Sequence, residues 1–246
     1  GVLDAGAERY TFVEEYGVNS DHDSLYSMAG IFYNLQKLGD RYVLLGELRG
    51  DLMQTEDDAS AYLKQINEFT VTKDNPYAST KEYYAVINNC NYTIKNVDTS
   101  RVYNGYDKKM YRLMASAKSI RAWTYLQLAL NYGSVNYIVD PILSAEDAEK
   151  EYQKLDIDGL ADALIEDLLP FKDIPTLNLG SFASFETKLS IFPIKFLLGD
   201  LYLLKKDYLN AAKMYHELMY DNSLIISDSY KNVVTFTNNA PSGYEY

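Results

Sequence analysis

With 246 residues, of which 47% are hydrophobic, the chain can fold as a globular protein without disulfides or structural metal. The 23 Lys and Arg residues stand against 35 Asp and Glu residues, and the resulting net charge of -12 excludes nucleic acid as an expected partner, because it repels phosphate backbones. Cys90, His22 and His216 are too few for an intrachain disulfide or a zinc cluster, so no metal or other cofactor is expected.

The aromatic residues are mostly tyrosine, with 24 Tyr against one Trp and nine Phe. A tyrosine ring is apolar on its face and polar at its tip, which suits surfaces that bind sugar. The most apolar stretches, such as residues 123–130, fall short of the roughly 18 consecutive apolar residues of a membrane-spanning helix.

Apolar residues recur at helical spacing in at least six segments, so the chain is predicted to be all-α. A first helix ends at Gly39 and Asp40, and a second begins at Val43, which predicts an antiparallel hairpin. The apolar face of the first helix comprises Leu25, Met28, Phe32, Leu35 and Leu38.

A third helix follows the polar stretch at residues 56–60. Its apolar residues are spaced by three or four positions, and Cys90 is among them, so we expect the thiol to point into the core. These residues are Tyr83, Ile87, Cys90, Ile94 and Val97.

The longest predicted helix spans residues 107–132 and stops at Gly133, which can adopt a left-handed conformation. A shorter helix is predicted at 157–169. Two prolines then break the chain, and an irregular segment is expected at 178–184. One face of the long helix carries Met110, Leu113, Met114, Ala117 and Ile120.

The last two helices carry the most specific motif, a tetratricopeptide-like pattern of small and aromatic residues. Gly199 and Ala211 allow the helices to approach, Tyr202 and Tyr215 fill the groove beside them, and residues 207–208 form the turn. An ordinary helical hairpin is the alternative interpretation.

One such hairpin cannot bury its own apolar face, so the earlier helices are expected to stack on it. The predicted architecture is a single domain, 1–246, of degenerate tetratricopeptide-like stacked helical hairpins with irregular loop insertions. The helical pattern ends near residue 223.

Several segments together resemble the SusD-like (RagB/SusD) family in order and character. The motif RAWTY at 121–125, continued by LNYG at 130–133, is similar to the family's long helix. Residues 83–91 are similar to the preceding helix, 199–211 to the tetratricopeptide pair, and 47–51 (ELRGD) to an acidic loop motif. The resemblance covers nearly the whole chain.

The resemblance implies a non-enzymatic outer-membrane lipoprotein that binds glycans at the cell surface and delivers them to a SusC-like TonB-dependent transporter. Membrane attachment would occur only through an N-terminal lipid anchor that this chain does not contain. Family members are usually longer, so we expect that the chain corresponds to the tetratricopeptide-containing portion and lacks the C-terminal half. Val135-Asn136 replaces the family's common Val-Pro.

Two loops offer the groups that sugar recognition needs, with side chains that bind hydroxyls in both and an aromatic ring in the second, and the resemblance places both on the sugar-binding face. The alternative interpretations are a solvated edge for the first loop and a simple turn and helix cap for the second. The first loop offers Arg49, Asp51, Gln54, Asp57 and Asp58; the second offers Asp74, Asn75, Pro76 and Tyr77, with Lys81 one turn later.

Other residues that could be proposed as binding or catalytic groups are better explained by structural roles. Trp123 lies within a long apolar helix and is predicted to pack in the core. His22 precedes a helical pattern and suits an N-terminal cap better than catalysis. Glu166 and Asp167 are adjacent on a helix, about 100° apart, so they cannot face one sugar as a glycosidase pair.

The competing hypothesis is a tetratricopeptide adaptor that binds a peptide or protein partner in its groove. An enzyme ranks third, because the common nucleophile and phosphate-binding motifs are missing from the sequence.

Overall fold

The computed structural model describes residues 26–39, 59–68, 72, 74–100, 109–177, 181–182, 185–186 and 191–220. Within these ranges the chain is mainly helical, which confirms the predicted all-α class. The helices are residues 26–39, α3 (Ala61–Asn67), α4 (Lys81–Asn96), α5 (Lys109–Tyr132), α6 (Ala145–Glu149), α7 (Ile157–Leu168), α9 (Ile194–Leu204) and α10 (Tyr208–Tyr220), with short 3₁₀ turns η1 (Pro76–Ala78) and η2 (Leu169–Phe171).

Two small antiparallel sheets accompany the helices. Strand β1 (Val135–Asn136) pairs with β2 (Lys154–Leu155), and β3 (Ser181–Phe182) pairs with β4 (Phe185–Glu186). The second pair corrects the expectation of a wholly irregular segment at 178–184. Period-two patterns cannot show in strands of two residues, so neither pair was predicted.

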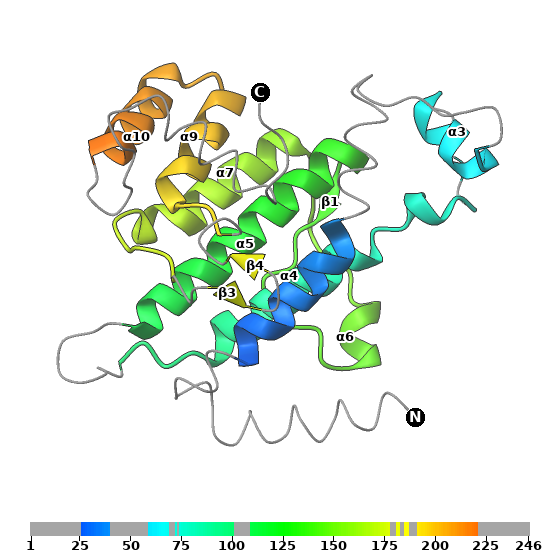
Figure 1. Cartoon of the computed structure of the whole chain (residues 1–246), viewed down its shortest axis with the longest axis horizontal. Coiled ribbons are helices and arrows are strands. Elements are labelled where there is room, and N and C mark those ends of the chain that lie inside the picture. Colours follow the sequence, from blue (N-terminus) through cyan, green and yellow to red (C-terminus); the bar gives the residue numbers. More distant parts are fainter. Residues whose placement is uncertain are drawn as a thin grey trace.

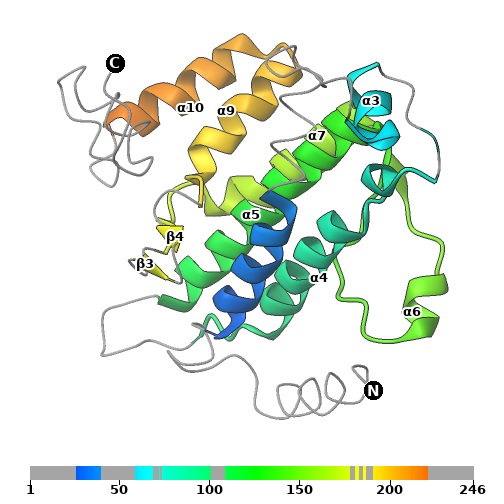
Figure 2. The same ribbon diagram turned by 45° about the vertical axis from the view of Figure 1, so that its right-hand side comes forward.

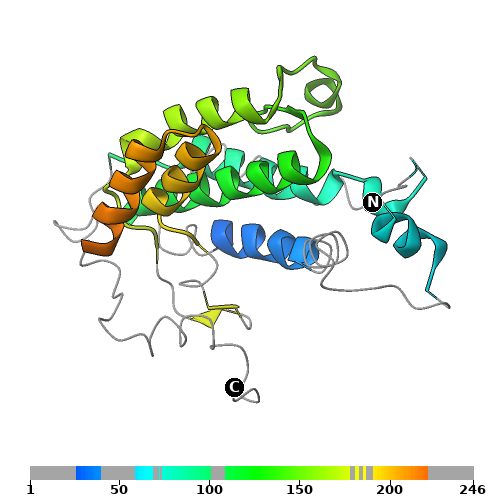
Figure 3. The ribbon, with the colours of Figure 1, turned by 90° about the horizontal axis from the view of Figure 1, so that it is seen from above.

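Helix α5 is the central element of the described fold (Figure 1). It packs against α4, α7 and α9, and Figure 3 shows helix 26–39 on the side of α5 opposite α7. Residues 115–122 of α5 are all buried. A helix covered on every side needs apolar or satisfied residues all round, so the single apolar face predicted for it was incomplete.

Helices α4 and α5 are antiparallel, because the Tyr83 ring near the start of α4 lies 5.7 Å from the Tyr132 ring at the end of α5. Gly133 follows with φ of 83°, as predicted for the residue that stops the helix. Cys90 is buried, as predicted, and burial raises the pKa of its thiol to about 12.

Helix 26–39 lies against α4 through the predicted apolar face. Met28, Phe32 and Leu38 are buried, and the carbonyl of Gly30 accepts a hydrogen bond of 3.2 Å from the Asn89 amide on α4. The second helix of the predicted hairpin, from Val43, lies outside the described residues.

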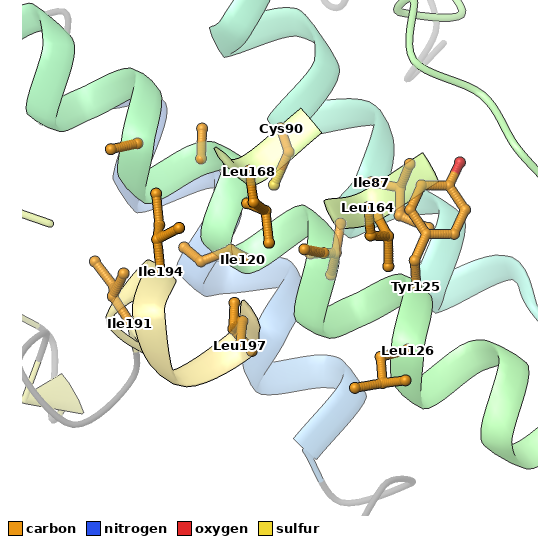
Figure 4. Close-up of a cluster of buried hydrophobic side chains, with 14 of the residues drawn as sticks. Ile87, Cys90, Ile120, Tyr125, Leu126, Leu164, Leu168, Ile191, Ile194 and Leu197 are labelled. Atoms are coloured by element: carbon orange, nitrogen blue, oxygen red, sulfur yellow. The ribbon is translucent and has the colours of Figure 1, made fainter. Parts of the chain in front are cut away.

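The main core lies where α4, α5, α7 and α9 meet (Figure 4). Ile87, Ile120, Leu164, Leu168 and Leu197 converge there from the four helices. Burial of such side chains contributes about 1.5–3 kcal/mol each and is the dominant stabilising term.

Trp123 packs against this core while remaining partly exposed, and its ring lies 6.3 Å from that of Phe192. The structural role predicted for this residue is confirmed.

Helices α9 and α10 form the predicted close hairpin, visible in Figure 2. A Cβ atom on Gly199 would lie 2.5 Å from Cε1 of Tyr215, so only glycine allows this approach. Ala211 is buried on the facing helix. The turn lies at 205–207 rather than 207–208, with Lys206 at φ of 59° and Asp207 accepting a hydrogen bond from the N–H of Asn210.

Candidate functional site

The loop before α4 is fastened to α3 by Asn75. This side chain is 2% exposed, and its Nδ2 donates to the Tyr62 carbonyl at 2.9 Å and to Gln65 Oε1 at 2.8 Å. The sequence places Asn75 among the candidate ligand groups, but its amide is occupied inside the protein. Because a buried polar group is costly without partners, Asn75 makes α3 and the loop one unit.

Asp74 faces solvent beside this anchor. The Thr72 hydroxyl donates to Asp74 Oδ1 at 2.5 Å, and this hydrogen bond holds the pKa of the carboxyl below its usual value. The group is therefore an ionised acceptor at neutral pH. Such an oxygen can accept hydrogen bonds from sugar hydroxyls.

The alternative interpretation of residues 74–76 as a turn and helix cap holds only for the turn. These residues form a turn and the start of η1, whereas the residue before α4 is Thr80, whose side chain makes no capping hydrogen bond. The loop therefore runs several residues further before the helix begins, and Tyr132 contacts it through a hydrogen bond of 3.5 Å to the Ser79 carbonyl.

Of the predicted ligand residues, Lys81 is exposed in the first turn of α4, where its ammonium can reach solvent. Tyr77 has its backbone in η1, between Asp74 and Lys81, whereas its side chain is not among the described ones. The structure thus brings the second loop to one end of the α4–α5 pair. Arg49, Asp51, Gln54, Asp57 and Asp58 lie outside the described residues.

Tyr62 is a candidate that the sequence analysis missed. It lies on α3, its side chain is among the exposed large hydrophobic ones at 40%, and its carbonyl binds Asn75. Its position places a partly exposed ring on the same unit as Asp74. A seven-residue helix is too short to give a clear periodic signal, so α3 was not predicted, although Ser60 caps it by accepting a hydrogen bond of 3.4 Å from the N–H of Leu63 at its Oγ.

A second polar arrangement holds residues 136–142, here called the strap, along α4 and α5. The Asn88 side chain bonds both backbone groups of Ile142, accepting from its N–H at 2.6 Å and donating to its carbonyl at 3.0 Å. Asn91 Nδ2 donates to the Ile138 carbonyl at 2.9 Å. Side chains of α4 therefore pair the backbone groups of Ile138 and Ile142, beyond the end of β1, in place of a neighbouring strand.

Two tyrosine hydroxyls complete this anchoring. The Tyr84 hydroxyl accepts from the N–H of Asn136 at 3.0 Å and lies 3.1 Å from its carbonyl. The Tyr125 hydroxyl accepts from the N–H of Ile138 at 2.7 Å. Burial raises the pKa of both hydroxyls, so they stay protonated and keep their donor function.

A buried ionic network links α5 to α7. Arg121 Nη2 lies 2.8 Å from Asp167 Oδ2, its Nη1 donates to Asn91 Oδ1 at 2.8 Å, and Lys118 pairs with the other carboxylate oxygen. Burial raises the pKa of Asp167, but the charge of Arg121 and the hydrogen bond from Lys118 outweigh it, so the net shift is downward. All three charges are internally paired, which makes the network structural.

This network also shows how the adjacent carboxylates Glu166 and Asp167 are oriented. Asp167 points into the network whereas Glu166 is exposed, which confirms that the two do not face one ligand. His22 lies outside the described residues, and among those described no group of three His, Cys, Asp or Glu residues could hold a metal.

Replacing Asn75 with alanine is expected to lower the free energy of unfolding of α3 and its loop by about 1–3 kcal/mol, because the Tyr62 carbonyl and Gln65 Oε1 lose the hydrogen bonds from a buried amide. Hydrogen exchange should show faster exchange of the α3 amides with little change in α5. Glu68→Ala, on the exposed end of the same unit, is the matched control. Equal protection in both variants would contradict the anchoring role.

In comparisons with known proteins, no family model matches the chain. The sequence is 26% identical over 179 residues to SusD-like protein P2 of Formosa agariphila, a match that covers 71% of this chain. The chain spans about a third of that relative, 34% of its length.

Among solved structures, the chain is similar to a SusD-like carbohydrate binding protein of Bacteroides fragilis, with a TM-score of 0.48 and 18% identity over 75% of this chain and 40% of that one. Within the described residues, no helix is both long enough and apolar enough to cross a membrane. The sequence match to the Formosa relative confirms the SusD-like resemblance predicted from the helical motifs.

Proposed function

We propose that the chain binds carbohydrate without transforming it. The observation that carries this proposal is the 179-residue match to a SusD-like protein. The α3 unit supports it, because a rigid anchor through Asn75 presents the ionised Asp74 and the ring of Tyr62 to solvent. Rings and hydrogen-bonding groups on loops held by rigid helices are what sugar recognition needs.

The proposal extends to the place and the partner of binding. By the SusD-like resemblance, the protein would sit at the outer-membrane surface through an N-terminal lipid and deliver oligosaccharide to a SusC-like TonB-dependent transporter. Co-purification of the membrane-anchored protein with a TonB-dependent transporter tests this part. Recovery without any such transporter would contradict it.

A peptide-binding adaptor is the second candidate, and the α9–α10 hairpin with its close Gly199–Tyr215 contact favours it. The two functions can be distinguished by the class of ligand that the chain binds. Calorimetry that detects an oligosaccharide supports the first, whereas binding of peptide alone supports the second. Release of reducing ends from the bound sugar would contradict both, because it requires catalysis.

The predicted ligand residues give a direct test. Tyr77→Ala is expected to cost about 1–3 kcal/mol of oligosaccharide binding, because a stacking face is lost, and Asp51→Asn should cost less. Calorimetry over an oligosaccharide panel measures the effect, with melting curves as the folding control. If wild type binds a sugar and both variants bind it equally well, the site lies elsewhere.

A further inference from the structure

Helix 26–39 exposes two tyrosines on one stripe. Tyr26 and Tyr33 are 62% and 59% exposed, whereas the opposite face is buried through Met28 and Ile31. Seven residues at 3.6 per turn bring the two side chains to within about 20° of each other and about 10.5 Å apart along the axis. The rings therefore form a row that the core does not use.

Little side-chain bulk separates the two rings, and a polar residue borders them. Gly30 lies between them and has no side chain, and its carbonyl accepts the amide hydrogen bond of Asn89. Lys37 Nζ lies 4.4 Å from the centre of the Tyr33 ring. We call Tyr26, Gly30, Tyr33, Lys37 and Asn89 the aromatic platform.

The charge of this helix differs from that of the chain. Residues 26–39 contain one charged side chain, Lys37, and no carboxylate, although the whole chain carries -12. The ammonium of Lys37 is already in contact with an aromatic ring, so the platform offers rings and hydrogen-bond donors with little free charge. This combination is complementary to a neutral polyhydroxyl ligand, whereas the net charge disfavours association of two copies or binding to anionic lipid.

We infer that the aromatic platform is a second sugar-contact surface, which takes neutral oligosaccharide chains by stacking on Tyr26 and Tyr33. The inference rests on the proposed function and adds a surface separate from the predicted loops. Two rings two turns apart would hold a chain of several sugar units, so longer glycans gain affinity that single sugars do not.

Affinity electrophoresis through native gels that contain soluble starch, arabinoxylan or laminarin tests this surface. The double variant Tyr26→Ala/Tyr33→Ala is expected to bind the retarding polysaccharide about tenfold more weakly, since each lost stacking contact reduces affinity severalfold. Tyr33→Phe should keep most of the affinity because its ring remains. Tyr208→Ala, which removes a 65% exposed tyrosine from α10, is the matched control and should behave as wild type.

The outcomes separate the two proposals. Unchanged retardation of the double variant, with weaker retardation of Tyr77→Ala, overturns the platform and leaves the proposed function standing. Weaker binding together with a lower melting temperature also overturns the platform, because the rings would then be structural. A wild-type chain that no gel retards overturns both proposals.

Discussion

Gly199→Leu is expected to destabilise the chain by about 1–3 kcal/mol, because overpacking at a close helix crossing forces the helices apart. The facing obstacle is the Tyr215 ring, three of whose atoms lie within 2.9 Å of where the new Cβ would stand. This ring cannot easily retreat, since its hydroxyl is held by Asp200. Chemical denaturation should show a lower midpoint at an unchanged slope.

Two control variants test whether the loss of stability arises from the Gly199–Tyr215 contact. Gly39→Leu adds the same side chain at a glycine with nothing within 4 Å of its Cβ position, so it should have little effect. Tyr215→Ala removes the obstacle, and Gly199→Leu should cost much less in that background. Equal costs in both backgrounds would show that the hairpin does not depend on the Gly199–Tyr215 contact.

Asp167→Ala should have the largest effect, about 3–5 kcal/mol, because it leaves two cations in the interior without their anion. The side chains of Arg121 and Lys118 are only 3% and 11% exposed, so water cannot replace the carboxylate. Glu166→Ala, which removes the neighbouring exposed carboxylate, should change stability by less than about 0.5 kcal/mol. Similar melting temperatures for the two variants would contradict the structural role of the network.

Acid denaturation offers a second measurement of the same network. The pKa of Asp167 is lower in the folded chain than its usual 3.8, so the unfolded chain binds its proton first as pH falls. The stability contributed by Asp167 is therefore complete above the unfolded pKa and is lost below it, as pH falls through the folded value. The pH dependence in this window should be weaker in Asp167→Asn.

Sequence periodicity located the helices that make up most of the described fold, because each carries a regular apolar face or a strong stop signal. Gly133 and Gly199 were identified because their roles depend on local chain geometry and on one facing helix. By contrast, the strap is held by Tyr84, Asn88 and Asn91, whose partners lie 47 to 54 residues away. Polar residues on a helix otherwise indicate a solvated face, so their function was not visible.

The candidate site was predicted only in part, for a similar reason. Asparagine beside proline is typical of an exposed turn, and nothing local indicated that Asn75 is buried against α3. Asp74 and Lys81 are exposed, as ligand groups would need to be, whereas the contribution of Tyr77, Arg49, Asp51, Gln54 and Asp57 stays a prediction.

The strap has an evolutionary consequence. Tyr84, Asn88, Asn91 and Tyr125 all bind its backbone N–H and carbonyl groups, which every residue except proline supplies in full. Mutations of its exposed side chains, at Val139 and Asp140, can therefore accumulate while the path of the segment is inherited unchanged, whereas Ile138 and Pro141 are buried. Selection could diversify these outward-facing positions, together with the neighbouring exposed Leu143, at little risk to the helices beneath.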